Sequence, residues 1–569
     1  MHPRVRIIVP AVVASVLALS ALPAAGSDAN SGNSPLNKIN HIVVIYEENH
    51  SFDNLYGGWE GVNGRGNAGA AQTVQIKQNG TTYNCLLQND VNLTSPTPLE
   101  TTCTDTTGTI PDATSTPFNS HFANAPFSIE AFIPASAQTC PQPGGFFLHG
   151  SRPSPANLPG GCTEDIVHRF YQEQYQLNNG NQNRYPTGSD AVGLTMGYYN
   201  TESLPIYQYL HQDGHPKYAI ADNFFQAAFG GSFLNHQWLI AAATPTWSGA
   251  PVANHSIIDS NGMPTSYPLY SATGPVLDKQ LTQVCPSLVP GRACGDYAVN
   301  TIQPAYQPFK GSPQLPPQTG TTIGDELSAA GVSWAWYSGG WSNADGDVGA
   351  PGWTNGSVPG VCADPYSSPN PSWPYCPNKV FQFHHQPFDY YAAYAPATAT
   401  TPAAPGRAHL QDEAAFISRA QSSSTSCNLN AVSFVKPIGL ENEHPGYTSE
   451  TSGSSHLVQL LKDIEGSACR KDTMVVVTYD EFGGQWDHVA SPGQGSTPGP
   501  HDLWGPGTRI PALVVAPFLH GNFVVDSAQH DTTSILATIE HRFSLAPLST
   551  RDASVNDLSS VFRAKQVGD

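Results

Sequence analysis

Six short apolar runs recur along the chain, each separated from the next by helical or loop-rich sequence. Their β-branched and aromatic residues are typical of buried strands. The runs span residues 41–46, 217–221, 332–337, 431–436, 474–479 and 511–516. Apolar residues at helical spacing lie between several of them, over residues 323–330, 455–466 and 531–543. This alternation predicts an α/β fold with a mostly parallel central sheet flanked by helices.

Three long blocks between these elements are rich in Gly, Pro, Ser, Thr and Asn. They span about residues 58–160, 241–320 and 338–380. The 569 residues include 52 Gly and 50 Pro, and only 12% are charged, a composition that favours long ordered loops. We therefore expect one large domain over residues 37–569, in which these blocks are insertions that form a cap.

The first residues have the layout of a cleaved export signal. Arg4 and Arg6 precede an apolar stretch from Ile7 to about Leu22, and small residues follow up to Gly26. Residues 1–26 are therefore expected to be a signal peptide, and the mature protein to be secreted or periplasmic. No other apolar run approaches the roughly 20 residues of a membrane helix, so we expect no stable membrane anchor.

The formal net charge of −20 comes from 44 acidic and 24 basic residues. Nucleic acids and anionic membranes are bound by basic patches, which this sequence does not display, so it disfavours both partners. If the substrate is an anion, its charge must be met locally. We expect a metal ion, histidines and helix ends to meet it without Lys or Arg.

Ten cysteines, an even number in an exported chain, favour disulfides over free thiols. Their spacing favours pairs of neighbours: Cys85–Cys103, Cys140–Cys162, Cys285–Cys294, Cys362–Cys376 and Cys427–Cys469. The alternative, a zinc cluster, is disfavoured because the sequence has no Cys-x-x-Cys spacing.

Acidic and amide side chains follow two of the predicted strands directly. Glu48 and Asn49 come after the run 41–46, and Asp480 and Glu481 come after the run 474–479. Strand ends are where α/β enzymes assemble their sites, and oxygen ligands of this kind suit a divalent cation. The two pairs therefore predict a metal site, whose metal the sequence does not identify.

Ser232 follows two glycines and opens a helical segment. A serine in this place lies where amide N–H groups and the helix dipole stabilise an anion, so its hydroxyl can act as a nucleophile toward a bound phosphoryl group. Gly-Gly-Ser alone is more often a plain turn with a helix cap. Histidines strengthen the catalytic interpretation because imidazoles can donate to phosphoryl oxygens and protonate a leaving group. The candidates are His168, His384, His385 and His444.

Other residues near these motifs have structural interpretations of equal or greater weight. Asp53 and Asp222 can be further ligands, but an aspartate at a strand or turn end more often caps backbone N–H groups. Asp487 and His488 can orient Asp480 or serve structure alone. The aromatic cluster around Trp336 can be a substrate platform, although packing against the sheet explains most of it better.

Nine blocks of this sequence occur in the order of a known family. They are ENHSFDNLYG, DIVHRFYQEQ, MGYYNTESLPIYQYL, ADNFFQAAFGGSFLNH, GVSWAWYSGGW, FVKPIGLENEHP, TYDEFGGQWDHV, PALVVAPF and FSLAPLSTRDASVNDLSSVF. Between about residues 38 and 563 the chain resembles the bacterial phosphoesterase family of acid phosphatases and phosphatidylcholine-type phospholipases C. That family is similar to the alkaline phosphatases.

The resemblance implies a two-step phosphoryl transfer. By position it implies that Ser232 is transiently phosphorylated, that His168, His384, His385 and His444 line the phosphate pocket, and that Glu48, Asn49, Asp480 and Glu481 hold the metal. The phospholipase branch typically has Thr after a Gly-Pro turn, whereas this chain has Ser after Gly-Gly, as in the acid phosphatase branch.

The sequence therefore predicts a secreted, metal-assisted phosphoric ester hydrolase that acts on a phosphate ester, with an acid phosphatase for phosphomonoesters as the first candidate. A phospholipase C that cleaves phosphodiester lipids is the alternative on the same fold. A non-catalytic binding protein on this scaffold is the alternative of a different class. The oligomeric state is not predicted.

Overall fold

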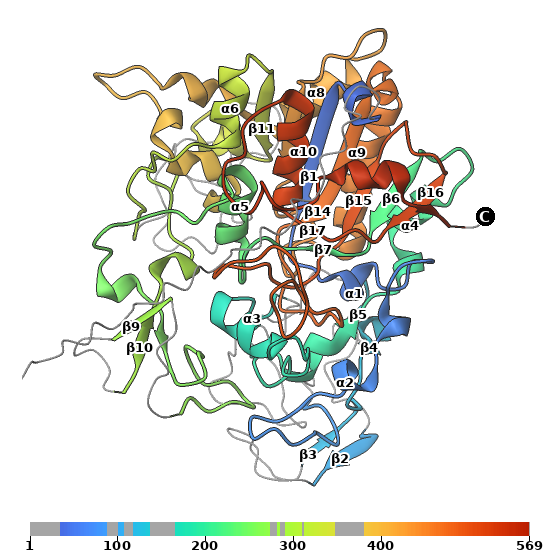
Figure 1. Ribbon diagram of the computed structural model, residues 1–569, viewed down its shortest axis with the longest axis vertical. Helices are drawn as coiled ribbons and strands as arrows, with labels where there is room; N and C mark the ends of the chain where they lie inside the picture. The colour runs from blue at the N-terminus through green and yellow to red at the C-terminus, as the bar shows by residue number, and fades with distance from the viewer. Residues whose placement is uncertain are drawn as a thin grey trace, which may run out of the picture.

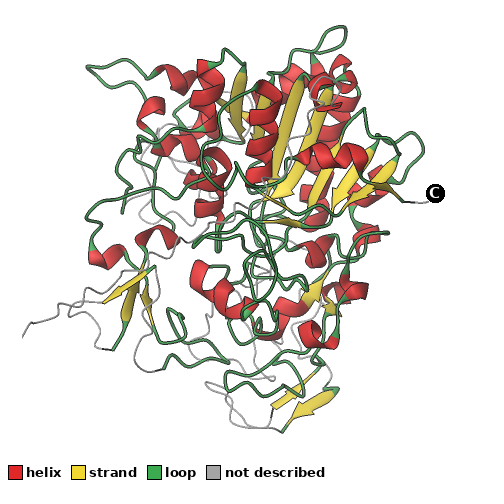
Figure 2. Cartoon of the chain, in the orientation of Figure 1, coloured by secondary structure: helices red, strands yellow, loops and turns green. Residues whose placement is uncertain are grey.

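The computed structural model describes residues 35–87, 101–106, 118–131, 133–136, 165–273, 281–284, 291–309, 312–347 and 381–567. The predicted signal peptide lies outside these residues. A large sheet with its helices occupies the upper part of the molecule in Figures 1 and 2, and loop-rich segments with short helices and small sheets occupy the lower part.

Among the described residues, the large sheet has nine strands. Their order is β12 (Leu410–Asp412), β11 (Trp334–Ser338), β13 (Val432–Lys436), β1 (His41–Glu47), β14 (Thr473–Tyr479), β15 (Ala512–Val515), β6 (Tyr218–Ala221), β16 (Phe523–Asp526) and β18 (Lys565–Gln566). The first five strands in this order are parallel to one another, and β6 is parallel to β16. Strand β15 is antiparallel to both of its neighbours, β14 and β6, and β18 is antiparallel to β16. The prediction of a mostly parallel α/β sheet is confirmed.

All six predicted strands and all three predicted helices are present. The helices are α6 (Ile323–Ala329), α9 (Glu450–Glu465) and α10 (Thr533–Phe543). Helix α9 begins five residues earlier than its apolar spacing predicts because Ser449 caps it, accepting a hydrogen bond from Ser452 N at 3.1 Å. The edge strands β12 and β18 and the strand β16 next to β18 were not predicted, since strands of two to four residues carry little periodic signal.

Two groups of helices accompany the sheet. Helices α4 (Pro205–Leu210) and α8 (Glu413–Gln421) each contact α9, and α5 (Ser232–Ala241) contacts both α6 and α10. The strands between them are buried, and every residue of β11, β13 and β14 is inaccessible to solvent or nearly so. Continuous apolar runs are typical of parallel strands covered by helices.

The remaining elements are short. They are α1 (Phe52–Leu55), α2 (Ala70–Thr73), α3 (Phe170–Leu177), α7 (Trp341–Ala344), β2 (Cys103–Asp105), β3 (Phe118–Ser120), β4 (Phe127–Ser128), β5 (Gly197–Tyr198), β7 (Phe224–Phe225), β8 (Ile257–Ile258), β9 (Thr282–Val284), β10 (Ala293–Gly295) and β17 (His530–Asp531). Strands β8, β10 and β9 form a small sheet within the predicted insertion 241–320.

The aromatic cluster around β11 serves packing. Trp334, Trp336 and Tyr337 are buried, and Trp336 stacks on Phe434 of the adjacent strand with ring centroids 5.5 Å apart. Trp341 is also buried. These rings are thus part of the core, and the structural interpretation of the cluster holds.

Two of the five expected disulfides join described residues, and both pair neighbours. They are Cys85–Cys103 and Cys427–Cys469. Each of the other three predicted pairs includes a cysteine outside the described residues.

We expect peptide mapping under non-reducing conditions to find both of these disulfides and no free thiol, because each closes a local loop in the folded chain. A matched digest of reduced protein provides the control. Several alkylatable cysteines in the folded protein would contradict the expectation.

Candidate active site

The two predicted acidic motifs meet at one edge of the sheet. Strands β1 and β14 are adjacent and parallel, with Glu47 opposite Tyr479, so Glu48 and Asp480 leave the sheet side by side. Asn49 N donates to Asp480 Oδ1 at 3.0 Å. Asn49 has a φ of 61°, a left-handed conformation that asparagine adopts more readily than most residues.

All four side chains of these motifs are completely buried, although three are acidic. Four of their oxygens accept no hydrogen bond from any described residue: Asn49 Oδ1, Asp480 Oδ2, Glu481 Oε1 and Glu48 Oε1, the last of which has ion-pair contacts with His385 and Lys436. Buried oxygens without a donor are costly unless a cation satisfies them. They are hard ligands, and the residues therefore fit a divalent cation.

Ser232 lies beside this group as the first residue of α5. Its hydroxyl donates to Glu48 Oε2 at 3.1 Å. The preceding turn needs glycine, because Gly230 has a φ of 87° and a Cβ there would collide with the backbone of Phe170. The sequence signal of two glycines before a serine thus corresponds to a tight approach between the turn and α3.

The predicted histidines surround the same group. His385, in the turn Phe383–His385, has Nε2 2.9 Å from Glu48 Oε1. His168 Nε2 lies 3.5 Å from Glu481 Oε1 and 3.4 Å from Asn49 Nδ2, and His444 Nε2 is also 3.4 Å from Asn49 Nδ2. His384 lines the adjoining cavity with Ser232.

Two further residues of the site were not predicted. Lys436, the last residue of β13, is fully buried, contacts Glu48 Oε1 and donates to Tyr46 O at 2.9 Å. His236 has Nε2 3.8 Å from Glu48 Oε1, and its ring is stacked on that of His385, with ring centroids 5.0 Å apart. Lys436 meets the charge of Glu48 and does not line the cavity, so the expectation that the substrate's charge is met without Lys or Arg stays a prediction, although Arg169 lies in the cavity wall.

Both missed residues left a signal in the sequence. Lys436 is a lone charge that ends an otherwise apolar strand, a position that is normally costly. His236 follows Ser232 by four residues, so the two share one face of α5. The four-residue spacing indicates a site residue only in combination with the assignment of Ser232 as the nucleophile.

The basic side chains around Glu48 make its pKa differ from the pKa values of the neighbouring acids. Burial opposes ionisation of Glu48, yet His385 and Lys436 hold its pKa well below the usual range. Burial and the charge of Glu48 raise the pKa of Asp480, and burial and the charge of Asp480 raise the pKa of Glu481. The group thus contains more carboxyl groups than the described basic residues can keep ionised.

Burial acts on the histidines in the opposite direction from the acids. It lowers the pKa of His168 and, more strongly, that of His236 and His384, and it lowers the pKa of His385 to about 4. Imidazoles that are neutral near pH 7 can each donate one hydrogen bond and accept one.

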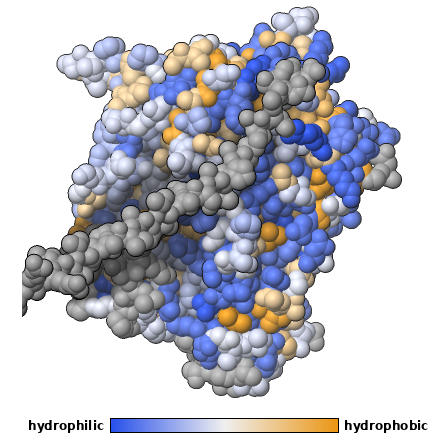
Figure 3. Space-filling model, viewed as in Figure 1, coloured by the Kyte–Doolittle hydropathy of each residue, from blue (hydrophilic) through white to orange (hydrophobic). Residues whose placement is uncertain are grey.

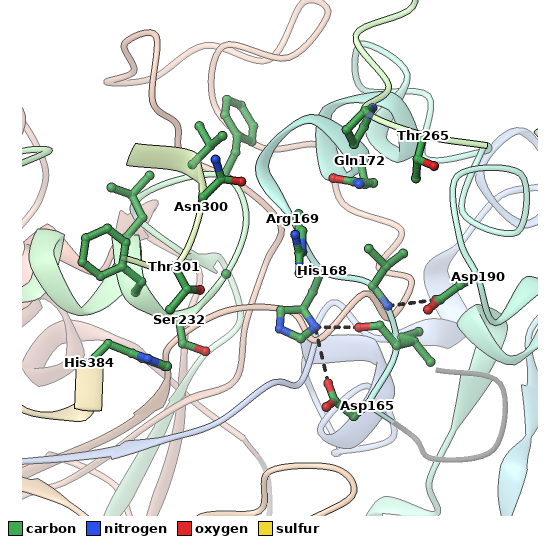
Figure 4. A pocket seen from close by; sticks show the side chains of 18 of the residues that line it. Asp165, His168, Arg169, Gln172, Asp190, Ser232, Thr265, Asn300, Thr301 and His384 are labelled. Carbon is green, nitrogen blue, oxygen red and sulfur yellow. Dashed lines mark hydrogen bonds and ion pairs between the residues drawn. The ribbon is translucent and has the colours of Figure 1, made fainter. Parts of the chain in front are cut away.

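A cavity of about 990 Å³ opens above Ser232. Figure 4 shows Ser232, His168 and His384 converging on it, with Gln172, Asp190 and Thr265 on the far side. The insertion 241–320 contributes part of the wall through residues 264–268 and 298–301. Phe229, Phe233 and Tyr447 add apolar surface. A cavity of this size accommodates a whole small molecule, of which a phosphoryl group is a minor part.

Asp53 and Asp222 cap backbone amides. Asp53 Oδ2 accepts a hydrogen bond from His488 N at 2.9 Å, and Asp222 Oδ2 accepts one from Asn63 N at 2.7 Å. Both residues thus act as caps, and the Asp53 carboxylate also pairs with His488 and Arg509.

Asp487 belongs to a separate buried network. Arg509 donates to Asp487 Oδ1 and Oδ2 at 3.1 Å or slightly more, and its Nη2 is 3.1 Å from Asp53 Oδ1. Among the described residues Asp487 makes no hydrogen bond to Asp480, so the proposal that it orients Asp480 is not supported. The network instead joins the segments that follow β1 and β14.

Comparison with known proteins adds the family relationships. A family model described as the Phosphoesterase family matches residues 39–138 and 151–546. Phospholipase C A of Mycobacterium tuberculosis is 25% identical over 557 residues, which cover 93% of this chain and 78% of that protein. Phospholipase C B of the same organism is 34% identical, but the match spans only 24% of this chain and 29% of that protein.

Two further matches are a plant protein and a solved structure. Non-specific phospholipase C6 of Arabidopsis thaliana is 30% identical over 138 residues, or 21% of this chain and 26% of that protein. A protein in the alkaline phosphatase superfamily from Vibrio parahaemolyticus matches with a TM-score of 0.28 and 12% identity, over 63% of this chain and 65% of the other.

Proposed function

Because this chain belongs to the phosphoesterase family, we propose that it is a metal-assisted phosphoric ester hydrolase that acts on phosphomonoesters, an acid phosphatase. One observation carries the proposal. The Ser232 hydroxyl lies 3.1 Å from Glu48 Oε2, beside buried acidic and amide oxygens that lack donors, at a cavity lined by histidines.

In this proposal Ser232 is the nucleophile. Its oxygen attacks phosphorus, a Ser–O–P bond forms as the bond to the leaving oxygen breaks, and water then hydrolyses the phosphoserine. Glu48 Oε2 accepts the hydroxyl hydrogen bond before attack. His168, His384 and His444 line the cavity, where their ring nitrogens can donate to phosphoryl oxygens and to the leaving oxygen.

Glu48, Asn49, Asp480 and Glu481 would hold the divalent cation. When bound, such an ion supplies positive charge to the phosphoryl oxygens and lowers the pKa of a serine hydroxyl. The charge of Lys436 and the contact with the His385 ring keep Glu48 ionised, so the anionic oxygen that the ion needs is already available.

Export remains part of the proposal. The disulfides Cys85–Cys103 and Cys427–Cys469 suit an oxidising compartment, in line with the predicted signal peptide. No helix among the described residues is long and apolar enough to cross a membrane.

The surface favours a small soluble ester over a lipid. Leu503 is the one large hydrophobic residue that the described part of the chain exposes, at 49%. Hydrophilic residues predominate on the face in Figure 3, and apolar residues form only small groups. An enzyme that works on a bilayer needs a larger apolar rim or an attractive charge, and the net charge of −20 opposes binding to anionic lipids.

Phospholipase C is the second candidate, since the named relatives are phospholipases C. The 990 Å³ cavity also has room for a group much larger than phosphate. The Gly-Gly-Ser turn resembles the acid phosphatase branch and supports the first candidate.

A matched assay tests the choice. We expect the purified enzyme to hydrolyse aryl and sugar monophosphates faster than phosphatidylcholine at equal enzyme and saturating substrate, and to lose both activities on chelation. Faster hydrolysis of the lipid would move the protein to phospholipase C. Turnover of neither ester, with metal bound, would favour a binding protein.

A further inference from the structure

Glu173 is a completely buried carboxylate on α3, five residues after His168. No described Lys, Arg or His lies within ion-pair distance of it, although a buried charge normally needs such a partner. Four hydrogen bonds satisfy it instead. Its Oε2 accepts from Gly230 N at 2.5 Å and from Gln226 Nε2 at 3.0 Å, and its Oε1 accepts from Thr508 N at 2.6 Å and Thr508 Oγ1 at 2.8 Å.

Gln226 extends this arrangement to the acidic motif after β14. Its Oε1 accepts from Phe482 N at 3.0 Å, directly after Glu481, while its Nε2 also donates to Ala228 O at 2.8 Å and to Gly230 O at 3.2 Å. A single amide therefore joins the segment of Glu481 to the turn that precedes Ser232.

Three segments that carry residues of the site thus meet at the side chains of Glu173 and Gln226. Neither side chain contacts a reacting group. Glu173 comes from the segment of His168, Gly230 from the turn of Ser232, and Phe482 from the segment of Glu481. We infer that Glu173, with Gln226, is a positioning residue that sets where the Ser232 hydroxyl lies relative to the acidic group. This inference rests on the proposed function, in which Ser232 is the nucleophile.

The chemistry of the four donors makes Glu173→Gln an informative change. Gln has nearly the same shape, but its amide nitrogen would face N–H donors in place of an acceptor oxygen. The Gly230 turn must then move. A displacement of about 1 Å costs on the order of a hundredfold in rate, so we expect kcat to fall about ten- to a hundredfold, with KM and metal affinity changed less than about threefold.

Ligand binding separates positioning of the nucleophile from a general loss of structure. Orthovanadate bonds to a nucleophile as the transferring phosphorus does, whereas inorganic phosphate binds without that bond. Measured by calorimetry on the metal-loaded enzyme, vanadate affinity should fall about tenfold or more in Glu173→Gln, and phosphate affinity by less than about threefold. Asp552→Asn is the control, because Asp552 is a buried carboxylate whose hydrogen bonds come from Leu548, Ser549 and Ala553.

An unchanged kcat, a parallel loss of metal, or an equal effect of Asp552→Asn would overturn the inference. If Glu173→Gln does not fold, Thr508→Val removes only the hydroxyl donor, and kcat should fall about threefold; an unchanged kcat would then count against Glu173. Wild-type enzyme that binds vanadate no more tightly than phosphate would overturn the proposed nucleophile and this inference with it.

Discussion

Ser232→Ala is expected to lower kcat about a thousandfold or more while the protein remains folded. The described cavity offers no second hydroxyl beside Glu48 Oε2, so no other group takes over the phosphoryl transfer. Steady-state assays on an aryl monophosphate measure the loss.

Ser232→Thr is the matched variant, because it keeps a hydroxyl on the same helix end and should retain more activity than Ser232→Ala. Inorganic phosphate should still bind to both. If Ser232→Ala keeps more than a tenth of wild-type activity, Ser232 is not the nucleophile.

Asp480→Asn should lower metal content and activity together, each by about tenfold or more. The change replaces an anionic oxygen at a buried position with a neutral amide, and hard divalent cations depend on anionic oxygen ligands. Metal analysis of the dialysed protein and assays at increasing metal concentration measure the two effects, and excess metal should restore part of the activity. Glu48→Gln should behave in the same way.

Asp472→Asn is the control for this prediction. Asp472 precedes β14 at the opposite end of the same strand, where it accepts a hydrogen bond from Asn40 Nδ2 at 2.6 Å. The Asp472→Asn variant should have the same metal content and turnover as the wild-type enzyme. Full metal occupancy and normal turnover in Asp480→Asn would mean that the acidic pair only caps the strand end.

The elements that place the site could be predicted because their signals are local. Each central strand is a continuous apolar run, and a strand between two others in a parallel sheet must have this composition. Glu48 and Asp480 directly follow such runs, so their meeting at one sheet edge follows from the pairing of β1 with β14.

The residues that tune and position the site were not predictable in the same way. Glu173 lies in ordinary sequence surroundings, and the lone charge of Lys436 at a strand end does not show which carboxylate it pairs with. The importance of both residues depends on tertiary contacts with Gly230 and Glu48. Arg509 likewise has no local signal, because it joins segments about 450 and 20 residues away, at Asp53 and Asp487. A single sequence shows which side chains can take part in chemistry. It does not show which other residues position those side chains.

The position of β1 in the sheet has a consequence for the order in which the chain is made. β1 starts at residue His41, whereas the two strands that pair with it, β13 and β14, begin at Val432 and Thr473. For most of the synthesis, therefore, an apolar strand has two open edges, which is a hazard for aggregation. If the acidic group holds the metal as proposed, a nascent chain that ends before Asp480 lacks half of that site, so we expect it to be inactive toward esters.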